Sequence, residues 1–446
     1  MLSRSITPLH ATALVVGIIV GASIFVQPTV ISGAVPTVSG VYWVWITAGV
    51  LTLFGALIAA ELASAYPHAG GVYVFLREAF SPAVRFLWGW AMFWTMHTGI
   101  IAVIAMVFAR YMAFFIPVGD VGPRLLAIGA IVALTAVNYV GARQGSLVQT
   151  TLTLLKLGAV VAIIVVAFTL GHSAGVQPST GLGLSTTPAQ AFTFSKFLTA
   201  VAAGLFAFGG WHMVTYAAEE TREPERTIPR ALWLGVLIVT GCYVALNAAY
   251  FHVLTPAQIA GSTRVAADAA DAVLGRGGAA LMSAIVALST FGALNGVILS
   301  GPRAYLAMAR DGLLVSWAAA IHPRFRTPHR AILLQGAWAI VLVSTGTYRV
   351  LFTRVVYTEW IFFALMAAGL MRLRRRRGYS PAYRVWGYPV VPLVFIICSA
   401  YIVLNQIVTD PVESRTGLLL VGAGLPVYLL WLRKRTPSLP TAQHAD

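Results

Sequence analysis

Long apolar stretches alternate with short polar segments along the whole chain. Twelve of these stretches are long enough to cross about 30 Å of hydrocarbon as helices. They lie at residues 11–35, 40–66, 83–116, 124–142, 150–171, 194–218, 229–253, 278–308, 329–347, 352–372, 386–408 and 416–432. No polar segment is long enough for a soluble domain. The pattern therefore predicts an all-α polytopic membrane protein, with twelve transmembrane helices in one domain over residues 1–446.

The amino-acid composition supports the same class of protein. Of the 446 residues, 59% are hydrophobic and 10% are charged, and the mean hydropathy is +0.82. This is far more apolar surface than a soluble globular protein buries. The net charge of +16 would suggest nucleic acid in a soluble chain. Here the basic residues lie in short loops between apolar spans, so membrane orientation explains them and no nucleic-acid partner is expected.

The basic residues are divided unequally between the two sides of the predicted membrane. The loops of one side carry 21 of the 30 Lys and Arg residues and those of the other side 8, with Lys156 left inside a span. Because cytoplasmic loops carry the excess of positive charge, we expect both termini in the cytoplasm. Nearly all basic residues are arginine, and no Asn-x-Ser/Thr sequon occurs. Both features favour a bacterial plasma membrane.

Three segments outside the spans have distinct compositions. Residues 172–193 form a loop rich in Ser, Thr, Gly and Pro, residues 254–277 fit a short amphipathic helix on the outer surface, and residues 436–446 resemble a disordered tail. The two cysteines, Cys242 and Cys398, both lie in apolar runs, and no metal-ligand spacing occurs. We therefore expect no disulfide, cofactor or metal.

Small residues interrupt the first and the sixth spans. The first contains GIIVGASIFVQP at residues 17–28, and the sixth contains GLFAFGGWHMV at residues 204–214. Glycines spaced as Gly17 and Gly21 are also a common helix-packing device, which is the alternative interpretation. Two interruptions five spans apart instead indicate an inverted repeat with two discontinuous helices facing each other at the midplane. Its halves are residues 9–171 and 194–372, and residues 386–432 hold helices 11 and 12.

An unwound turn exposes backbone groups that no helix satisfies, and in hydrocarbon each such group costs several kcal/mol. The break is tolerable where it lines a polar cavity or binds a ligand. Free N–H groups at the start of the second half-helix suit a carboxylate; they belong to Ala22, Ser23 and Ile24. Carbonyls at the ends of the preceding half-helices suit an ammonium; they belong to Ile19, Val20, Phe206 and Ala207. An anion beside a cation is the headgroup of an α-amino acid.

At these residues the chain resembles the amino acid–polyamine–organocation superfamily, and most closely its L-amino acid transporter, light-chain-like branch. The resemblance covers nearly the whole chain through IIVGASIFVQP, AELASAYPHAGGVYVFLREAF, LFAFGGWHMVTYAAEE with REPERTIPRA, and STFGALNGVILSGPRAYLAMARDGLL with IHPRFRTP; DPVES and GAGLPVYLLW follow. It implies the LeuT-type fold of five plus five helices and import or exchange of amino acids.

The resemblance also assigns roles to individual residues. Gly21, Ala22 and Ser23 match the substrate loop G-S-G, with Ser23 where glycine is usual. In the sixth span the matches are Phe206, which closes over the substrate, Gly209, beside the side-chain pocket, and Trp211 in register. His212 stands where related transporters often carry Asn, so a pocket role and a proton-shuttling role are both open.

Lys156 is a basic residue within the fifth predicted span. The resemblance places it beside the unwound first helix, where its ammonium would stand in for the sodium ion of sodium-coupled relatives. The alternative is a lysine that reaches the membrane surface along its apolar stem. Near the cytoplasmic ends, Glu61, Glu219 and Glu220 need partners because they are acidic residues at membrane depth. We expect them to pair with arginines such as Arg226 or Arg310 and to hold an inner gate; direct contact with the substrate is the alternative.

The leading hypothesis is sodium-independent transport of neutral L-amino acids by alternating access, with exchange of internal for external substrate. No acidic residue lies in either broken segment, which disfavours dedicated cationic substrates. Proton symport, with Lys156 or His212 carrying the proton, is the alternative. A substrate sensor on the same scaffold and a membrane transferase are further possibilities, but the latter lacks a carboxylate pair with motif spacing. The loop PVGDVGPR lacks the cysteine that links animal light chains to a heavy chain, so no such partner is expected.

Overall fold

The computed structural model describes residues 2–21, 23–116, 119, 121–171, 193–262, 264–275, 277–346 and 357–432. Throughout these ranges the chain is helical between short loops, and the only β-type pairing is a single parallel bridge between Ile6 and Thr221. The predicted all-α class is confirmed.

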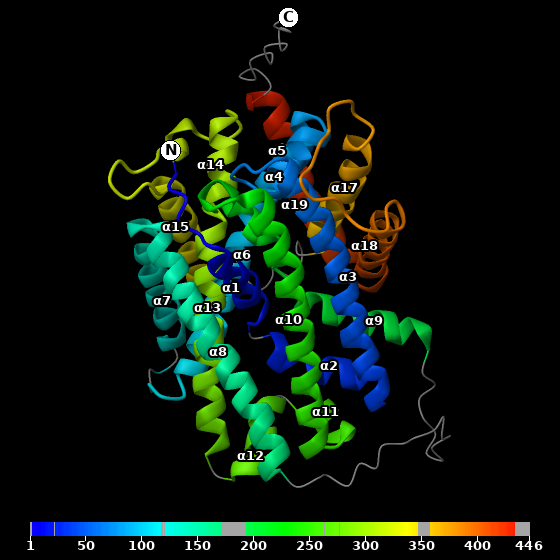
Figure 1. The fold of residues 1–446 in the computed structure, drawn as a ribbon. Coiled ribbons are helices and arrows are strands. Elements are labelled where there is room, and N and C mark those ends of the chain that lie inside the picture. Colours follow the sequence, from blue (N-terminus) through cyan, green and yellow to red (C-terminus); the bar gives the residue numbers. More distant parts are fainter. Residues whose placement is uncertain are drawn as a thin grey trace, which may run out of the picture.

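The elements follow one another as a long series of helices, some of them short (Figure 1). The first are α1 (Pro8–Ile19), α2 (Ser23–Ala34), α3 (Val38–Ala65), α4 (Val72–Ala79), α5 (Pro82–Ala91), the π-helix η1 (Met92–Met96), α6 (His97–Met112), α7 (Gly122–Val140) and α8 (Ala142–Leu170). Next come α9 (Phe194–Ala207), the 3₁₀-helix η2 (Trp211–Glu220), α10 (Pro224–Val253), α11 (Pro256–Gly261), α12 (Val265–Leu274), α13 (Gly278–Ser300) and α14 (Pro302–Arg310). The last are η3 (Ser316–Ala319), α15 (His329–Thr345), α17 (Thr358–Leu373), α18 (Val390–Thr409), α19 (Pro411–Gly422), α20 (Gly424–Val427) and η4 (Tyr428–Leu432).

Eight helical segments of the described chain are long and apolar enough to cross a membrane, or nine when α1 and α2 count as one broken span. Helix α8 shows the outward face of such a span, since its exposed side chains are large and apolar. They are Leu147, Leu154, Leu155, Val161, Val165, Phe168 and Leu170. The chain is therefore a multi-pass membrane protein. The other three predicted spans correspond to α15, α17 and the α19–η4 segment, which are shorter or interrupted, so the number twelve stays a prediction.

Some boundaries differ from the predicted ones for local reasons. Helix α8 begins at Ala142, eight residues before the predicted start at 150, because a single extended glycine, Gly141, is enough to separate it from α7. The third predicted span contains the π-turn η1, where the hydroxyl of Thr98 donates a 2.7 Å hydrogen bond to the carbonyl of Phe93. The apolar pattern carries no signal for that extra residue per turn.

The two predicted outer segments fare differently. Residues 254–277 do form helix, as α11 and α12, and α11 begins with a capping box between Thr255 and Gln258. The predictions for residues 172–192 and for the tail 436–446 lie outside the described residues.

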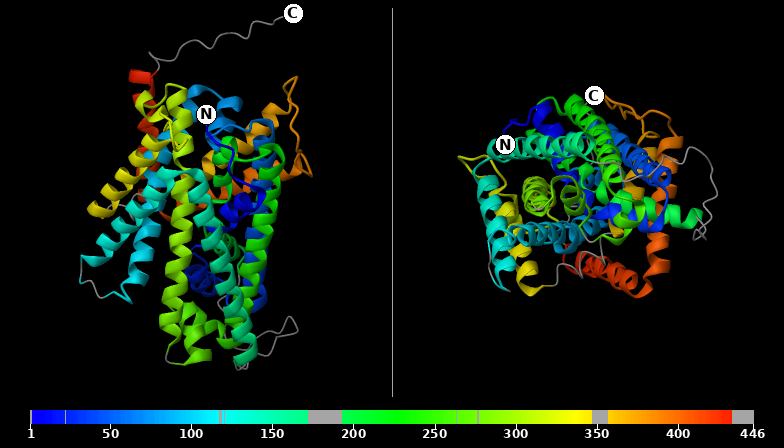
Figure 2. Two further views of the ribbon diagram at one scale, coloured as in Figure 1. Left: turned by 60° about the vertical axis from the view of Figure 1, so that its left-hand side comes forward. Right: turned by 90° about the horizontal axis from the view of Figure 1, so that it is seen from below.

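Helix α13 stands near the middle of the bundle and packs against α1, α6 and α8 (Figure 2). The residues before α1 lie at the same end as α4, α5 and α14, and α11 and α12 lie at the opposite end (Figure 1). The first of these ends carries Arg77 of α4, Arg85 of α5, and Arg303 and Arg310 of α14.

Both predicted helix interruptions are present. Helix α1 ends at Ile19, and α2 resumes at Ser23 at an angle of 46° to it. Helix α9 ends at Ala207, and the chain turns through Gly210 into the 3₁₀-helix η2. The two breaks face each other, since a Cβ atom on Gly210 would lie 2.4 Å from Cγ2 of Ile18. The inverted repeat of residues 9–171 and 194–372 stays a prediction.

Gly210 is the residue that this meeting of the two breaks requires. Its φ of +93° is left-handed, and an added Cβ would collide with Ile18. We expect Gly210→Ala to destabilise the protein by about 1–2 kcal/mol through the backbone alone, and more through the collision. The measurement is the melting temperature of the purified protein in detergent.

Gly241→Ala is the matched control, because Gly241 lies within α10 with φ in the helical range and no atom near its added Cβ. Alanine is favoured over glycine within a helix by about 0.5–1 kcal/mol, so this variant should melt at the wild-type temperature or slightly above. Equal melting of both variants would contradict the role assigned to Gly210.

Candidate functional site

A cavity of about 240 Å³ lies where the two helix breaks meet. The breaks and their flanks contribute one part of its wall, and α6, α13 and α17 contribute the rest. The wall consists of Ile18, Ile19, Gly21, Ser23, Val26, Gln27, Ile100, Val103, Ile104, Val107, Leu205, Phe206, Ala207, Gly209, Gly210, Trp211, Met213, Ala293, Val297, Glu359, Trp360 and Phe363. It is mainly apolar, with backbone polar groups at the breaks. This is the arrangement expected of a small-molecule site.

The carbonyls predicted to bind an ammonium come together at one side of this cavity. The hydroxyl of Tyr243, on α10, lies 2.9 Å from the carbonyl oxygen of Ile19 and 3.0 Å from that of Ala207. A tyrosine hydroxyl has one proton and donates fully to only one of them. Ile19 and Ala207 both line the cavity, so acceptor capacity remains there for a ligand ammonium. The carbonyl of Ile19 also accepts a 2.8 Å hydrogen bond from the N–H of Gly21, which leaves its second acceptor position, and that of Phe206 accepts one of 3.1 Å from the N–H of Gly209.

Lys156 lies directly behind the first break and is fully buried. Its Nζ donates to the carbonyl oxygens of Gly17 and Val20, each at 2.8 Å, and of Ser289 at 2.9 Å. An ammonium has three donors, and all three are used. The Ser289 hydroxyl also donates to Val20, at 3.0 Å. The sequence predicts that the carbonyl of Val20 faces a substrate ammonium. In the structure this carbonyl is already paired with the ammonium of Lys156.

The predicted carboxylate side of the site is only partly described. Gly21 and Ser23 line the cavity, Ile24 is buried outside its wall, and Ala22 lies outside the described residues. Ser23 is the first residue of α2, and the N–H groups of a first helical turn have no partner within the helix. The positive end of α2 therefore reaches the cavity at Ser23.

The sixth-span residues separate into cavity wall and supporting layer. Phe206, Gly209 and Trp211 line the cavity, and Phe206 is 39% exposed. His212 is buried behind the wall, with its ring centroid 4.8 Å from that of Phe363. The structure thus brings together most of the predicted residues of both breaks, and it places His212 one layer behind them.

Glu359 and Tyr243 are part of this site and were missed by sequence reasoning. The carboxylate of Glu359 lines the cavity from the first turn of α17, and its Oε1 lies 3.5 Å from Nε2 of His212. An acidic residue inside an apolar run is the signal that would have found Glu359. Tyr243 has no comparable signal, because tyrosine is common in membrane helices.

Two ion pairs with fully buried carboxylates lie at the basic end of the bundle. Glu220 pairs with Arg303, whose Nε lies 2.6 Å from its Oε2, and both side chains are fully buried. Glu61 accepts from Nε of Arg374 at 2.8 Å and from the N–H of Val385 at 2.7 Å. We call these two pairs the inner ion pairs.

The predicted arginine partners were partly wrong. Arg310 does pair with a predicted carboxylate, that of Glu219, at 2.8 Å. Arg226 instead lies 3.9 Å from Glu223, an exposed neighbour on the same segment. Loop arginines are numerous at this end, and charge pattern alone does not say which of them a buried carboxylate reaches.

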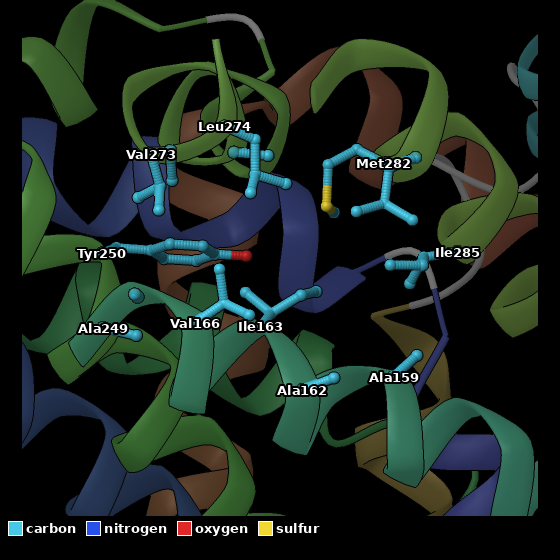
Figure 3. A pocket seen from close by; sticks show the side chains of 14 residues that line it. Ala159, Ala162, Ile163, Val166, Ala249, Tyr250, Val273, Leu274, Met282 and Ile285 are labelled. Carbon is cyan, nitrogen blue, oxygen red and sulfur yellow. The ribbon is translucent and has the colours of Figure 1, made fainter. Parts of the chain in front are cut away.

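A second cavity of about 220 Å³ lies apart from the breaks, between α8, α10, α12 and α13. Figure 3 shows its apolar wall, with the hydroxyl of Tyr250 directed into it. Its wall has no charged residue and consists of unbroken helix, so it lacks the free backbone groups that would hold an amino-acid headgroup.

A multi-pass bundle with two broken helices around a small polar-ended cavity defines the class of membrane transporters. The family model of amino acid permeases matches residues 6–430, and the chain belongs to this family. It is 32% identical to the serine/threonine exchanger SteT of Bacillus subtilis strain 168, over 98% of either chain. It is 30% identical to the mouse Asc-type amino acid transporter 1, over 96% of this chain and 81% of the relative. It is 28% identical to the human cystine/glutamate transporter, over 97% of this chain and 86% of the relative.

Lys156→Met tests whether the buried lysine holds the first break together. It leaves the carbonyl of Gly17 without its Lys156 donor, and an unsatisfied buried group costs about 1–3 kcal/mol. We expect a lower melting temperature and loss of amino acid uptake in proteoliposomes. Lys196→Met, near the start of α9, removes the same charge away from the breaks and should leave both unchanged. A Lys156→Met protein with normal melting and uptake would mean that the lysine has no role at the break.

Arg303→Met tests the inner ion pairs. Because it leaves the charge of Glu220 buried and unpaired, it should destabilise the protein by about 3–5 kcal/mol, measured by thermal unfolding in detergent. The double variant Glu220→Gln/Arg303→Met has no buried charge and should recover part of this loss. Arg226→Met, in an exposed pair, should change stability by less than about 1 kcal/mol. A double variant less stable than Arg303→Met would contradict this account.

Proposed function

We propose that this protein carries neutral L-amino acids across the membrane without sodium, by alternating access, and that it exchanges internal for external substrate. The observation that carries the proposal is the ammonium of Lys156 with three carbonyl partners at the first break. A fixed cation at that point supplies positive charge to the break, so no sodium ion is needed there.

Exchange is favoured over proton symport because all three N–H donors of Lys156 are used in hydrogen bonds. A neutral amine has two N–H donors, so loss of a proton would remove one of the three hydrogen bonds that Lys156 makes at the break. Lys156 then acts as a fixed charge and does not carry a coupling proton. The relative SteT is named as a serine/threonine exchanger, which supports exchange and small neutral substrates for this chain as well.

The proposed substrate site uses the two breaks at once. The substrate ammonium lies at the carbonyls of Ile19 and Ala207, and its carboxylate lies at the start of α2 near Ser23. Phe206 and Trp211 close over it, and the inner ion pairs of Glu61 and Glu220 open for release. The arginines gathered at the end that holds the N-terminus support an orientation with both termini in the cytoplasm of a bacterial cell. The chain works without a disulfide-linked heavy chain.

The proposal is tested by uptake of labelled neutral L-amino acids into proteoliposomes. Vesicles preloaded with unlabelled amino acid are compared with empty ones, in sodium and in choline buffer, with and without an inward proton gradient. We expect uptake only into preloaded vesicles, equal in both buffers and indifferent to the gradient. Uptake into empty vesicles driven by the gradient would establish proton symport instead. Stimulation by sodium would overturn the role given to Lys156.

A further inference from the structure

The cavity contains one ionisable side chain in the described part of its wall, that of Glu359. Its side chain is 14% exposed. It lies in the first turn of α17, where the helix dipole stabilises a negative charge. No lysine or arginine among the described residues lies within ion-pair distance of it. Nε2 of His212 lies 3.5 Å from its Oε1.

His212 holds only a part of this carboxylate. Its ring is buried and is fixed edge-to-face against Phe363 and Tyr216, with centroids 4.8 and 5.5 Å away. A carboxylate has about four acceptor positions on two oxygens, and the contact with Nε2 of His212 occupies at most one of them. Glu359 therefore has acceptor capacity toward the cavity that no described side chain fills.

The unfilled acceptor positions of Glu359 matter because the rest of the cavity wall is mainly apolar. It includes Trp360 and Phe363 of the same helix and α6 residues such as Ile104. A carboxylate in such a place requires hydrogen-bond donors. The substrate headgroup already has partners at the two breaks. What remains to face Glu359 is the substrate side chain.

We propose that Glu359 is a specificity-determining residue that accepts a hydrogen bond from the side chain of the substrate. The preferred substrates are then amino acids whose side chain donates, through a hydroxyl or an ammonium group. Isosteric aliphatic amino acids leave the carboxylate without a donor and bind more weakly, because a buried polar group left unpaired is what rejects them. The inference rests on the proposed function, since it places an amino acid in this cavity, and a preference for the ammonium would revise the proposed substrate class from neutral to cationic amino acids. His212 is a positioning residue that fixes the carboxylate.

The test uses two pairs of similar shape, threonine against valine and lysine against norleucine, which lacks the terminal ammonium, as competitors of labelled amino acid exchange in proteoliposomes. For wild type we expect the donor-bearing member of at least one pair to inhibit at a concentration about ten- to a hundredfold lower. The pair that shows the difference tells whether the hydroxyl or the ammonium is preferred. In Glu359→Leu the difference should vanish while inhibition by valine or norleucine persists, and Glu359→Gln should lie between. Glu225→Gln, which removes an exposed acid at the start of α10, is the control and should behave as wild type.

The outcomes separate this inference from the proposed function. If no amino acid accelerates exchange in wild type, the proposed function fails. If exchange occurs but wild type does not distinguish either pair, only the role of Glu359 is overturned. Equal weakening of all competitors in Glu359→Leu would mean that the carboxylate binds the headgroup, which also overturns it. The role of Glu359 is also overturned if the Glu359 variants still discriminate within the pairs but lose a response of uptake to a proton gradient. Glu359 would then carry a proton.

Discussion

The structure depends on how the carbonyls of the first helix break are satisfied. Breaking a helix inside a membrane leaves polar groups where water cannot reach them. Here Lys156 from α8 donates to Gly17, Val20 and Ser289, and Tyr243 from α10 reaches the ends of both half-helices. The break is therefore held open by two neighbouring helices. Its geometry is fixed before any substrate binds, which lowers the ordering cost of binding.

The two ends of the molecule use polar groups in different ways. At the basic end the inner ion pairs join η2 to α14 and α3 to the segment after α17, and Glu220 with Arg303 is fully buried. Such pairs contribute little net stability, but separating them in a dry interior is costly. They suit a barrier that opens only when a conformational change supplies new partners. At the cavity, by contrast, Glu359 and the break carbonyls retain acceptor capacity that a ligand can fill.

The sequence predicted those features that depart from the pattern of an apolar membrane helix. Gly21 and Gly210 interrupt apolar runs, and Lys156 is a charge at membrane depth, so both breaks and the lysine stood out against the hydrophobic pattern. Tyr243 obeys every rule for a membrane helix and becomes visible only when its hydroxyl is seen between two carbonyls. Glu359 breaks the same rule at a similar depth, but nothing in the sequence connects the tenth predicted span with the two breaks. The partners of Glu61 and Glu220 depend on tertiary packing, since many arginines share that end.

The unfilled acceptors also bear on why exchange would be preferred to net transport. An empty cavity that changes its exposure must carry the break carbonyls of Ile19 and Ala207 and the carboxylate of Glu359 through a closed, water-poor state. An unpaired acceptor there costs free energy that a bound amino acid removes by supplying its ammonium and a side-chain donor. The loaded carrier then crosses a lower barrier than the empty one. The same groups that select the substrate would thus couple the movement of the carrier to the presence of cargo in both directions.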